Sequence, residues 1–185
     1  MTMNPEIRVT LPDYLPAHPE ILFVGINPGS YSARQGHYYA RGTNRFWWAL
    51  HSSGLVPIPL SAEEDERVVE FGLALTDLVK RPSNSAADVR SDEFAAGRLV
   101  LAEKVRRVRP LIVCFNGLTG YQQFFQESTR PGRQTRRLHG ARVFVLPSTS
   151  ARNAAYSRDV LLAHFRDLRV WRDTLRQENG QKEAS

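Results

Sequence analysis

Short apolar runs of strand length alternate with helical patterns along this chain, and this alternation constrains the fold most. The clearest runs lie at 20–26, 111–115 and 142–146, with a shorter run at 73–75. Between them lie segments whose apolar residues recur at helical spacing, such as 91–108. Strands that alternate with helices form parallel sheets with helices on both faces. We therefore expect an α/β fold in which the carboxyl ends of the strands share one edge.

The first apolar run ends abruptly in Gly25-Ile26-Asn27-Pro28-Gly29. Its Pro-Gly pair forces a turn that presents the carboxamide of Asn27 among accessible backbone N–H groups. Ligands of open α/β sheets bind at the carboxyl ends of strands. Asn27 is therefore a candidate site residue, although an ordinary strand-to-helix turn is the simpler interpretation of this motif taken alone.

Polar residues follow the other apolar runs as well. Asn116 follows the run at 111–115, and a Ser/Thr-rich loop with a single arginine, Arg152, follows the run at 142–146. Asp77 follows the short run at 73–75, where it could also be a helix cap or a turn acid. Because parallel strands end along one edge, we expect the loops from Asn27, Asn116 and Pro147 to line one crevice, with the segment before Asp77 contributing.

The expected organisation is one domain over 20–176, an irregular lead-in over 1–19 and a polar tail over 177–185. Within the domain, the sequence predicts the following segments: a loop at 30–42, a helix at 43–53, a short helix opened by a Ser61/Glu64 capping box and ended by Gly72, a helix at 91–108, a helix after 117, a basic loop at 130–137 and a long amphipathic helix from about 157.

Composition excludes several classes of protein. The chain has 185 residues, with 42% hydrophobic and 24% charged residues, which suits one globular domain with its own core. The lone cysteine, Cys114, lies inside an apolar run and is expected to be a buried small hydrophobe. One cysteine excludes an intramolecular disulfide and all-cysteine metal sites. Since the five histidines show no ligand spacing, we expect no metal and no cofactor.

Net charge and hydropathy indicate where the protein is located and which partners it could bind. No apolar run is long enough to span a membrane and no signal-peptide pattern opens the chain, so we expect a cytoplasmic protein with no membrane partner. The net charge is +6 and the pI is about 9.9. Arginine far outnumbers lysine and suits bidentate phosphate contacts. Nucleic acid is thus a candidate partner, and the basic loop at 130–137 could contact phosphates or be an ordinary solvated loop.

The predicted crevice contains groups that could hold a nucleobase. Tyr38 and Tyr39 offer aromatic faces for stacking. Backbone N–H groups around Ile26 and Gly29 could donate to the carbonyl edge of a base. The crevice lacks a lysine nucleophile, a Walker glycine pattern and a Ser-His-Asp spacing. These features favour binding of a base over the common forms of nucleophilic catalysis.

The loop after the last apolar run could hold the rest of a nucleotide and its duplex. Ser148 and Ser150 can bond phosphates without carrying charge. Arg152 lies near the small residues Ser150 and Ala151, in a loop that could push a long side chain into a double helix. Together with the stacking tyrosines, these are the parts needed to hold an extruded nucleotide.

The chain resembles a known family in several motifs. The stretch GINPGSYSARQGHYYARGTNRFWWAL and the later LPSTSARNA, with LVKRP and IVCFNG between them in order, are similar to the mismatch-specific uracil/thymine DNA glycosylases of the uracil-DNA glycosylase superfamily. The resemblance extends from about Phe23 to Arg172. It implies a three-layer α/β/α sandwich with a central four-stranded, mostly parallel sheet. It also implies a DNA repair enzyme that flips uracil, with thymine and modified pyrimidines as further candidates, chiefly opposite guanine.

The resemblance assigns roles residue by residue. Asn27 matches the catalytic asparagine that positions the attacking water, Tyr39 the aromatic that stacks on the flipped base, and Arg152 the wedge that fills the hole left in the helix. The base-binding candidates are Gly25, Ile26, Gly29, Tyr38, Tyr39 and Asn44. The candidates in the intercalating loop, whose SARNA form resembles the thymine-glycosylase branch, are Ser148, Ser150, Ala151, Arg152 and Asn153.

Asp77 departs from the family pattern, because relatives carry an amide or a lysine at that place. A carboxylate near the attacking water could be a general base, so Asp77 joins Asn27 as a catalytic candidate. No lysine stands where a Schiff base would be expected, which predicts a monofunctional enzyme that hydrolyses the N-glycosidic bond and leaves an abasic site.

The expected partner is double-stranded DNA with a U:G or T:G mismatch, bound by a monomer at the bacterial nucleoid. Two alternatives remain. One is a non-catalytic DNA-binding module that senses mismatches, and the other is a hydrolase of free nucleosides, which would not need the basic loop or Arg152.

Overall fold

The computed structural model describes residues 10–183 and contains one five-stranded sheet in the order β2-β1-β3-β5-β4. Four strands run parallel: β1 (Ile21–Gly25), β2 (Leu73–Asp77), β3 (Ile112–Asn116) and β5 (Ala141–Leu146). The fifth, β4 (Gly132–Leu138), pairs antiparallel with β5 at the sheet edge. The carboxyl ends of the parallel strands therefore lie along one edge, as expected.

The prediction of four strands was wrong by one, because the basic segment 130–137 is mostly strand β4 rather than loop. Its side chains are largely exposed, so no apolar alternation marks it in the sequence. Pairing with β5 creates the strand. The two strands meet at His139 and Gly140, which both have positive φ (47° and 89°), and a tight hairpin turn needs this conformation.

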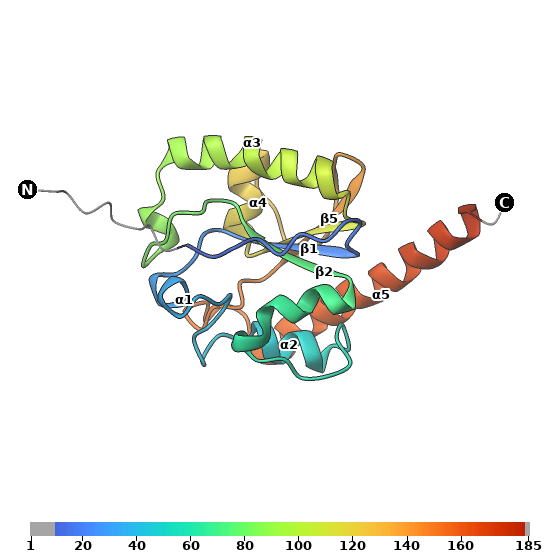
Figure 1. Ribbon diagram of the computed structural model, residues 1–185, viewed down its shortest axis with the longest axis horizontal. Coiled ribbons are helices and arrows are strands. Elements are labelled where there is room, and N and C mark those ends of the chain that lie inside the picture. The colour runs from blue at the N-terminus through green and yellow to red at the C-terminus, as the bar shows by residue number, and fades with distance from the viewer. Residues whose placement is uncertain (1–9, 184–185) are drawn as a thin grey trace, which may run out of the picture.

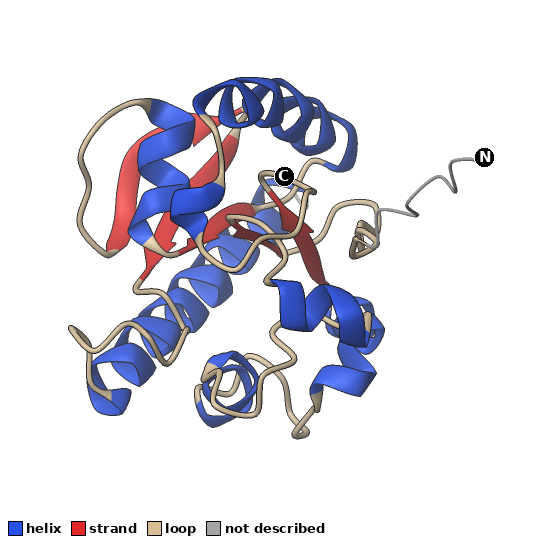
Figure 2. Cartoon of the chain, turned by 90° about the vertical axis from the view of Figure 1, so that its left-hand side faces the viewer, coloured by secondary structure: helices blue, strands red, loops and turns tan. Residues whose placement is uncertain are grey.

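Helices cover both faces of the sheet (Figures 1 and 2). The helices α3 (Ser91–Val108) and α4 (Leu118–Phe125) lie on one face, and α2 (Phe46–Ser52), the 3-10 segment η1 (Ala62–Phe71) and α5 (Arg158–Glu183) lie on the other. Two short segments, α1 (Ser30–Gln35) and η2 (Ala86–Asp88), lie in the loops after β1 and β2. The three-layer α/β arrangement is the one expected.

Several helix boundaries differ from the predictions. The segment 30–42 was expected to be loop, but Ser30–Gln35 forms α1, which Gly36 ends with a φ of 78°. The capping box at Ser61 and the left-handed Gly72 at the end of η1 are confirmed. The last helix continues to Glu183, beyond the expected start of the polar tail. Helix formation in these places depends on caps and packing that apolar periodicity does not report.

The strands bury alternate side chains in two separate apolar clusters. Phe23 and Cys114 pack with Phe46 and Phe165 on the face of α2 and α5. Val24 and Phe115 pack on the opposite face, towards α3 and α4. Cys114 is completely buried, and burial raises the pKa of its thiol well above the usual value. The prediction that this cysteine is a small core residue is confirmed.

The described part of the lead-in, residues 10–19, is irregular but packs against β2. Tyr14 exchanges two backbone hydrogen bonds with Leu75, each 3.0 Å long, and Leu11 is buried. Asp13 thereby reaches Lys80 and Lys104, with oxygen–nitrogen distances of 2.8 and 2.7 Å. This segment brings a carboxylate beneath the site described below. Within residues 10–183, no helix is long and apolar enough to cross a membrane.

Candidate active site

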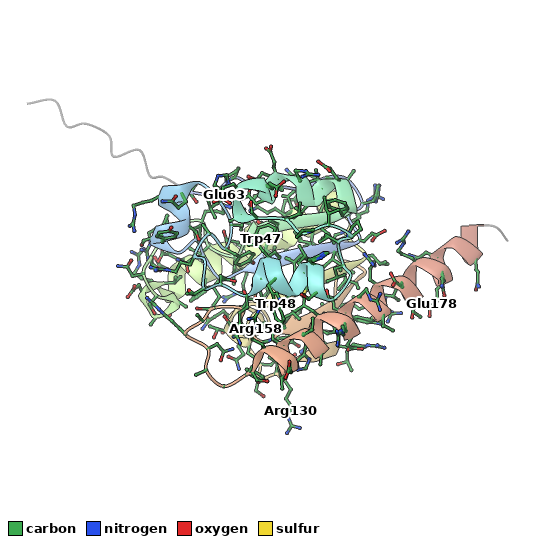
Figure 3. All side chains as sticks on the ribbon, turned by 90° about the horizontal axis from the view of Figure 1, so that it is seen from below. Trp47, Trp48, Glu63, Arg130, Arg158 and Glu178 are labelled. Atoms are coloured by element: carbon green, nitrogen blue, oxygen red, sulfur yellow. The ribbon has the colours of Figure 1, made fainter. Side chains whose placement is uncertain are left out.

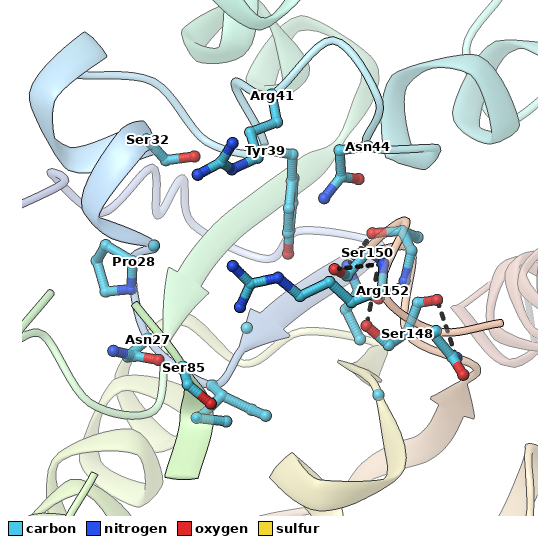
Figure 4. A pocket seen from close by; sticks show the side chains of 18 of the residues that line it. Asn27, Pro28, Ser32, Tyr39, Arg41, Asn44, Ser85, Ser148, Ser150 and Arg152 are labelled. Atoms are coloured by element: carbon cyan, nitrogen blue, oxygen red, sulfur yellow. Dashed lines mark hydrogen bonds between the residues drawn. The ribbon is translucent and has the colours of Figure 1, made fainter. Parts of the chain in front are cut away.

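A cavity of about 740 Å³ lies at the carboxyl edge of the sheet, within the size range of small-molecule sites. The loops that follow β1, β2, β3 and β5 all line it, as the parallel topology predicted. Asp77 and Asn116 line this cavity, together with Asn27 and Arg152, which lie on different walls (Figure 4). Residues far apart in the sequence therefore meet in one crevice.

The Asn-Pro-Gly turn is bonded to the segment that follows β2. Ser83 N–H donates to Pro28 O at 3.1 Å, and Ser30 N–H donates to Ser83 O at 3.0 Å. Val79 N–H also donates to Ile26 O at 2.9 Å. These bonds continue the pairing of β1 with β2 past the ends of both strands. The turn is therefore a fixed platform, and not merely a flexible connection into α1.

The side chain of Asn27 is oriented by two hydrogen bonds from its amide nitrogen. Nδ2 donates to Arg81 O at 2.9 Å and to Ser83 Oγ at 2.8 Å. A backbone carbonyl can only accept, so the nitrogen must face Arg81 and the oxygen must face away from it. Figure 4 shows this oxygen on the cavity side. It can accept a hydrogen bond from a water molecule placed there.

Asp77 is the last residue of β2 and lies at the wall of the same cavity. It is 4% exposed, and its Oδ2 is buried without a hydrogen-bond partner. The nearest cation is Lys80, whose Nζ lies 4.0 Å from Oδ2. Burial raises the pKa of Asp77 to about 7; Lys80 and Lys104 oppose this shift and Asp13 adds to it. Asp77 thus ends a strand as a poorly solvated carboxyl group, and the helix-cap alternative is wrong.

Tyr39 lies where an aromatic ring could contact a base. Its ring packs on Phe46 with a centroid distance of 4.1 Å, and its hydroxyl is buried without a partner. Its φ of 53° lies in the left-handed region, which is uncommon for a tyrosine and marks a position held by its surroundings. Figure 4 shows the ring standing between Arg41 and Asn44.

Tyr38 does not fit the stacking role that we expected for it. The residue is 1% exposed, its hydroxyl donates to Pro12 O at 2.9 Å, and its N–H donates to Asp65 Oδ2 at 2.8 Å. Tyr38 touches the cavity wall, but its ring packs in the core and offers no open face to a base. Composition alone did not distinguish the two tyrosines, whereas the family resemblance assigned the stacking role to Tyr39.

The remaining base-binding candidates also line the cavity, but they differ in what they do. Asn44 accepts a hydrogen bond from Phe46 N–H at 3.0 Å and so helps to begin α2. A side chain at Gly25 would collide with Oδ1 of Asp77, whereas one at Gly29 would meet nothing within 4 Å. Gly25 is therefore needed for the approach of Asp77, and Ile26 and Gly29 form the rim beside Asn27.

The loop over residues 147–157, here called the wedge loop, connects β5 to α5. Within it, Ser150 Oγ accepts from Arg152 N–H at 3.3 Å, and Asn153 Nδ2 donates to Ser148 O at 3.2 Å. The guanidinium of Arg152 reaches across to the opposite rim, where Nη1 donates to Asn84 O at 2.9 Å (Figure 4). All five of the loop residues predicted to bind DNA line the cavity.

The arginines of β4 are less available for phosphate contacts than the net charge of the chain suggests. On β4, Arg133 pairs with Asp167 at 2.5 Å and Arg136 with Glu127 at 2.8 Å. These internal partners favour an ordinary solvated strand over a dedicated phosphate site. Among residues 10–183, no group of three His, Cys, Asp or Glu side chains is arranged to hold a metal ion.

The sequence matches the family model of the uracil DNA glycosylase superfamily over residues 12–173. This span contains Asn27, Asp77 and the wedge loop. The chain belongs to this superfamily.

A curated superfamily relative is the G/U mismatch-specific uracil DNA glycosylase of Schizosaccharomyces pombe. It is 34% identical over 166 residues, which cover 84% of this chain and 51% of the yeast protein. The chain thus spans about half the length of this relative. The solution NMR structure of a Methanosarcina acetivorans protein, described as a candidate uracil DNA glycosylase, is similar in fold. It has a TM-score of 0.61 and 22% identity, and the match covers 88% of this chain and 98% of that one.

Two residues with prominent contacts at the site were not among the predicted ones. Arg45 donates to the backbone of the wedge loop, and Asp13 binds the two lysines nearest Asp77. Arg45 lies inside the NRFW motif, which could have drawn attention to it. Asp13 lies in the lead-in segment, where nothing in the sequence distinguishes it from a surface acid.

Proposed function

We propose that this protein is a monofunctional DNA glycosylase that flips uracil out of mismatched duplex DNA, chiefly opposite guanine. It hydrolyses the N-glycosidic bond and leaves an abasic site. Membership of the superfamily and the yeast relative's printed activity support this proposal. We further propose that it acts as a monomer in the cytoplasm, and that thymine or modified pyrimidines are secondary substrates.

The observation that carries the proposal is the fixed orientation of Asn27. Arg81 and Ser83 hold its amide nitrogen, so its carbonyl oxygen is presented to a cavity that also contains the Asp77 carboxyl group. An amide is a poor base, but it can orient a water molecule towards the sugar carbon. Such positioning can contribute several kcal/mol to the reduction of a barrier.

In the proposed reaction, the C1′–N1 bond breaks through an oxocarbenium-like sugar, and its electron pair leaves on uracil. The water oxygen then bonds to C1′. Backbone N–H groups beside Ile26 and Gly29 would stabilise the departing uracil anion in the manner of an oxyanion hole. Tyr39 would stack on the base and orient it within the cavity.

Asp77 would take the proton that the attacking water loses. The ionised form is required, and a pKa of about 7 leaves a substantial fraction ionised at neutral pH. A carboxylate with little solvation is a stronger base than one in water, because water no longer stabilises its charge. Its negative charge would also favour the developing positive charge on the sugar.

A direct assay tests the proposal. A duplex with one U:G mismatch is incubated with the protein and then treated with alkali, which cleaves abasic sites. Cleavage at the uracil that depends on alkali is expected, and its absence would reject the proposed activity. A panel with U and T opposite G and A, with single-stranded U added, measures the range of substrates.

The mismatch-sensing module is not favoured, because the yeast relative carries the name of an enzyme. A binding module would not need Asn27, and a nucleoside hydrolase would act without DNA and with little dependence on salt. The same assay on Asn27→Ala, together with free deoxyuridine as a substrate, distinguishes the three.

A further inference from the structure

The wedge loop is held by one side chain from outside it. The guanidinium of Arg45 donates to five backbone carbonyls of this loop: Ser148 O (3.2 Å), Thr149 O (3.5 Å), Ser150 O (3.3 Å), Asn153 O (3.2 Å) and Tyr156 O (2.7 Å). The N–H of Arg45 also donates to Thr149 O at 3.0 Å. These acceptors are spread over nine residues of a loop that has no helix or strand of its own.

An arginine suits this task because its planar guanidinium carries five donors in a fixed arrangement and stays charged at any physiological pH. Carbonyl groups that converge on one point repel each other unless a cation lies between them. Without the guanidinium, Ser148 O and Ser150 O would keep bonds from Asn153 within the loop. Asn153 O and Tyr156 O would lose the bonds that tie the second half of the loop to Arg45.

Arg45 is itself anchored on a rigid element. It directly precedes α2, whose first residue, Phe46, is completely buried against Phe23 and Phe165. Trp48 of α2 contacts α5. The guanidinium carbon of Arg158 lies over the Trp48 ring, 4.0 Å from the ring centroid (Figure 3). The loop is thus tied to α2 at its centre, and α5 is tied to α2 just after the loop ends.

A second anchor holds the start of the loop. Asn116 Nδ2 donates to Thr149 Oγ1 at 2.9 Å, and Thr149 N–H donates to Asn116 Oδ1 at 3.1 Å. Arg152 is exposed and lies between Ser150 and Asn153, whose carbonyls both accept from Arg45. Arg45 does not line the cavity, so it would influence the reaction only through the loop that it holds.

We propose that Arg45 is a positioning residue that holds the wedge loop in the conformation from which Arg152 enters the duplex. This inference rests on the proposed function. Its distinguishing consequence is that Arg45 matters for the extrusion of a paired base and not for the hydrolysis itself.

The test compares two substrates with one protein preparation. Arg45→Lys keeps the charge but cannot reach all the carbonyls. We expect single-turnover excision of U opposite G to slow by at least about tenfold, as small misplacements do. Excision of U opposite an abasic-site analogue, which has no pairing partner, should change by less than about threefold. Equal losses on both substrates, or no loss on either, would overturn the inference.

Two further measurements sharpen the result. Arg106→Lys, on the exposed side of α3 where Arg106 pairs with Glu103, is the matched control and should leave both rates unchanged. Combined with Arg152→Ala, the Arg45→Lys change should add no further loss on the U:G substrate, because both act through the same loop. Additive losses would contradict the proposal.

A fluorescence readout keeps the inference testable without catalysis. A 2-aminopurine placed beside the uracil brightens when the base stack opens. The wild-type protein should raise this signal on binding, and Arg45→Lys should raise it less at saturating protein. Equal signals would overturn the role of Arg45. An absence of excision by the wild-type protein, by contrast, would reject the proposed function alone.

Discussion

Gly25 and Asp77 are partners in register on the adjacent parallel strands β1 and β2, and the Asp77 carboxylate occupies the space where a side chain of residue 25 would lie. The first residue of the GINPG motif is therefore a glycine because the carboxyl group of Asp77 fills the space that a side chain would occupy. The two catalytic candidates, Asn27 and Asp77, are thus brought together by the pairing of the strands that precede them.

Replacement of Asn27 by alanine should slow single-turnover excision by about 10²-fold or more, because the water loses its orienting acceptor. Binding to U:G duplex should stay within about threefold of the wild type, since Asn27 does not belong to the wedge loop. Rapid-quench kinetics and a fluorescence binding titration measure the two quantities. An unchanged excision rate would remove Asn27 from the mechanism.

The excision rate should depend on the ionisation of Asp77. Its raised pKa of about 7 means that the carboxylate form increases as pH rises, so the wild-type rate should climb about tenfold between pH ~6 and pH ~8 and then level off. Asp77→Asn should be slower and independent of pH over this range. A variant that retains the full rate at neutral pH would show that Asp77 is not the base.

Asp13→Asn should move the pH midpoint of the reaction downward. In the wild type, the negative charge of Asp13 raises the pKa of Asp77, and Asp13 also engages Lys80 and Lys104. Without that charge, both lysines would favour the ionised form of Asp77 more strongly, while Tyr38 and Tyr39 stay neutral. A pH–rate profile measures the shift, and Asp92→Asn on the exposed start of α3 is the control.

Gly25→Ala should disable the site by displacing Asp77. The added methyl would collide with Oδ1, and Gly25 lies on β1, which is paired on both sides, with β2 and β3, and cannot shift freely. We expect a loss of about 1–3 kcal/mol in the free energy of unfolding and a loss of the pH-dependent rate. Gly180→Ala on α5, where a methyl meets nothing within 4 Å, serves as the comparison in thermal denaturation. A stable, fully active Gly25→Ala protein would contradict this account of the glycine.

Much of the site could be predicted because parallel strands impose a simple geometry. Apolar runs that alternate with helices determine that the residues after each run, such as Asn27 and Asn116, end on the same edge. The motif around Asn27 and the loop around Arg152 could be recognised separately, and the topology required them to meet. These inferences depend on local composition and chain order, which a sequence contains in full.

Other features depend on contacts between distant segments, and only the tertiary structure decided them. Strand β4 exists because β5 lies beside it, and its exposed basic residues give no strand pattern. Tyr38 and Tyr39 are adjacent in the chain and both touch the cavity, yet Tyr38 is almost fully buried and Tyr39 is partly exposed, with a φ of 53°. The pKa of Asp77 and the contacts of Arg45 arise from burial and from carbonyls about a hundred residues away. The sequence thus determines which functional groups the candidate residues carry, whereas the packing of the folded chain determines their solvation and their hydrogen-bond and ion-pair partners.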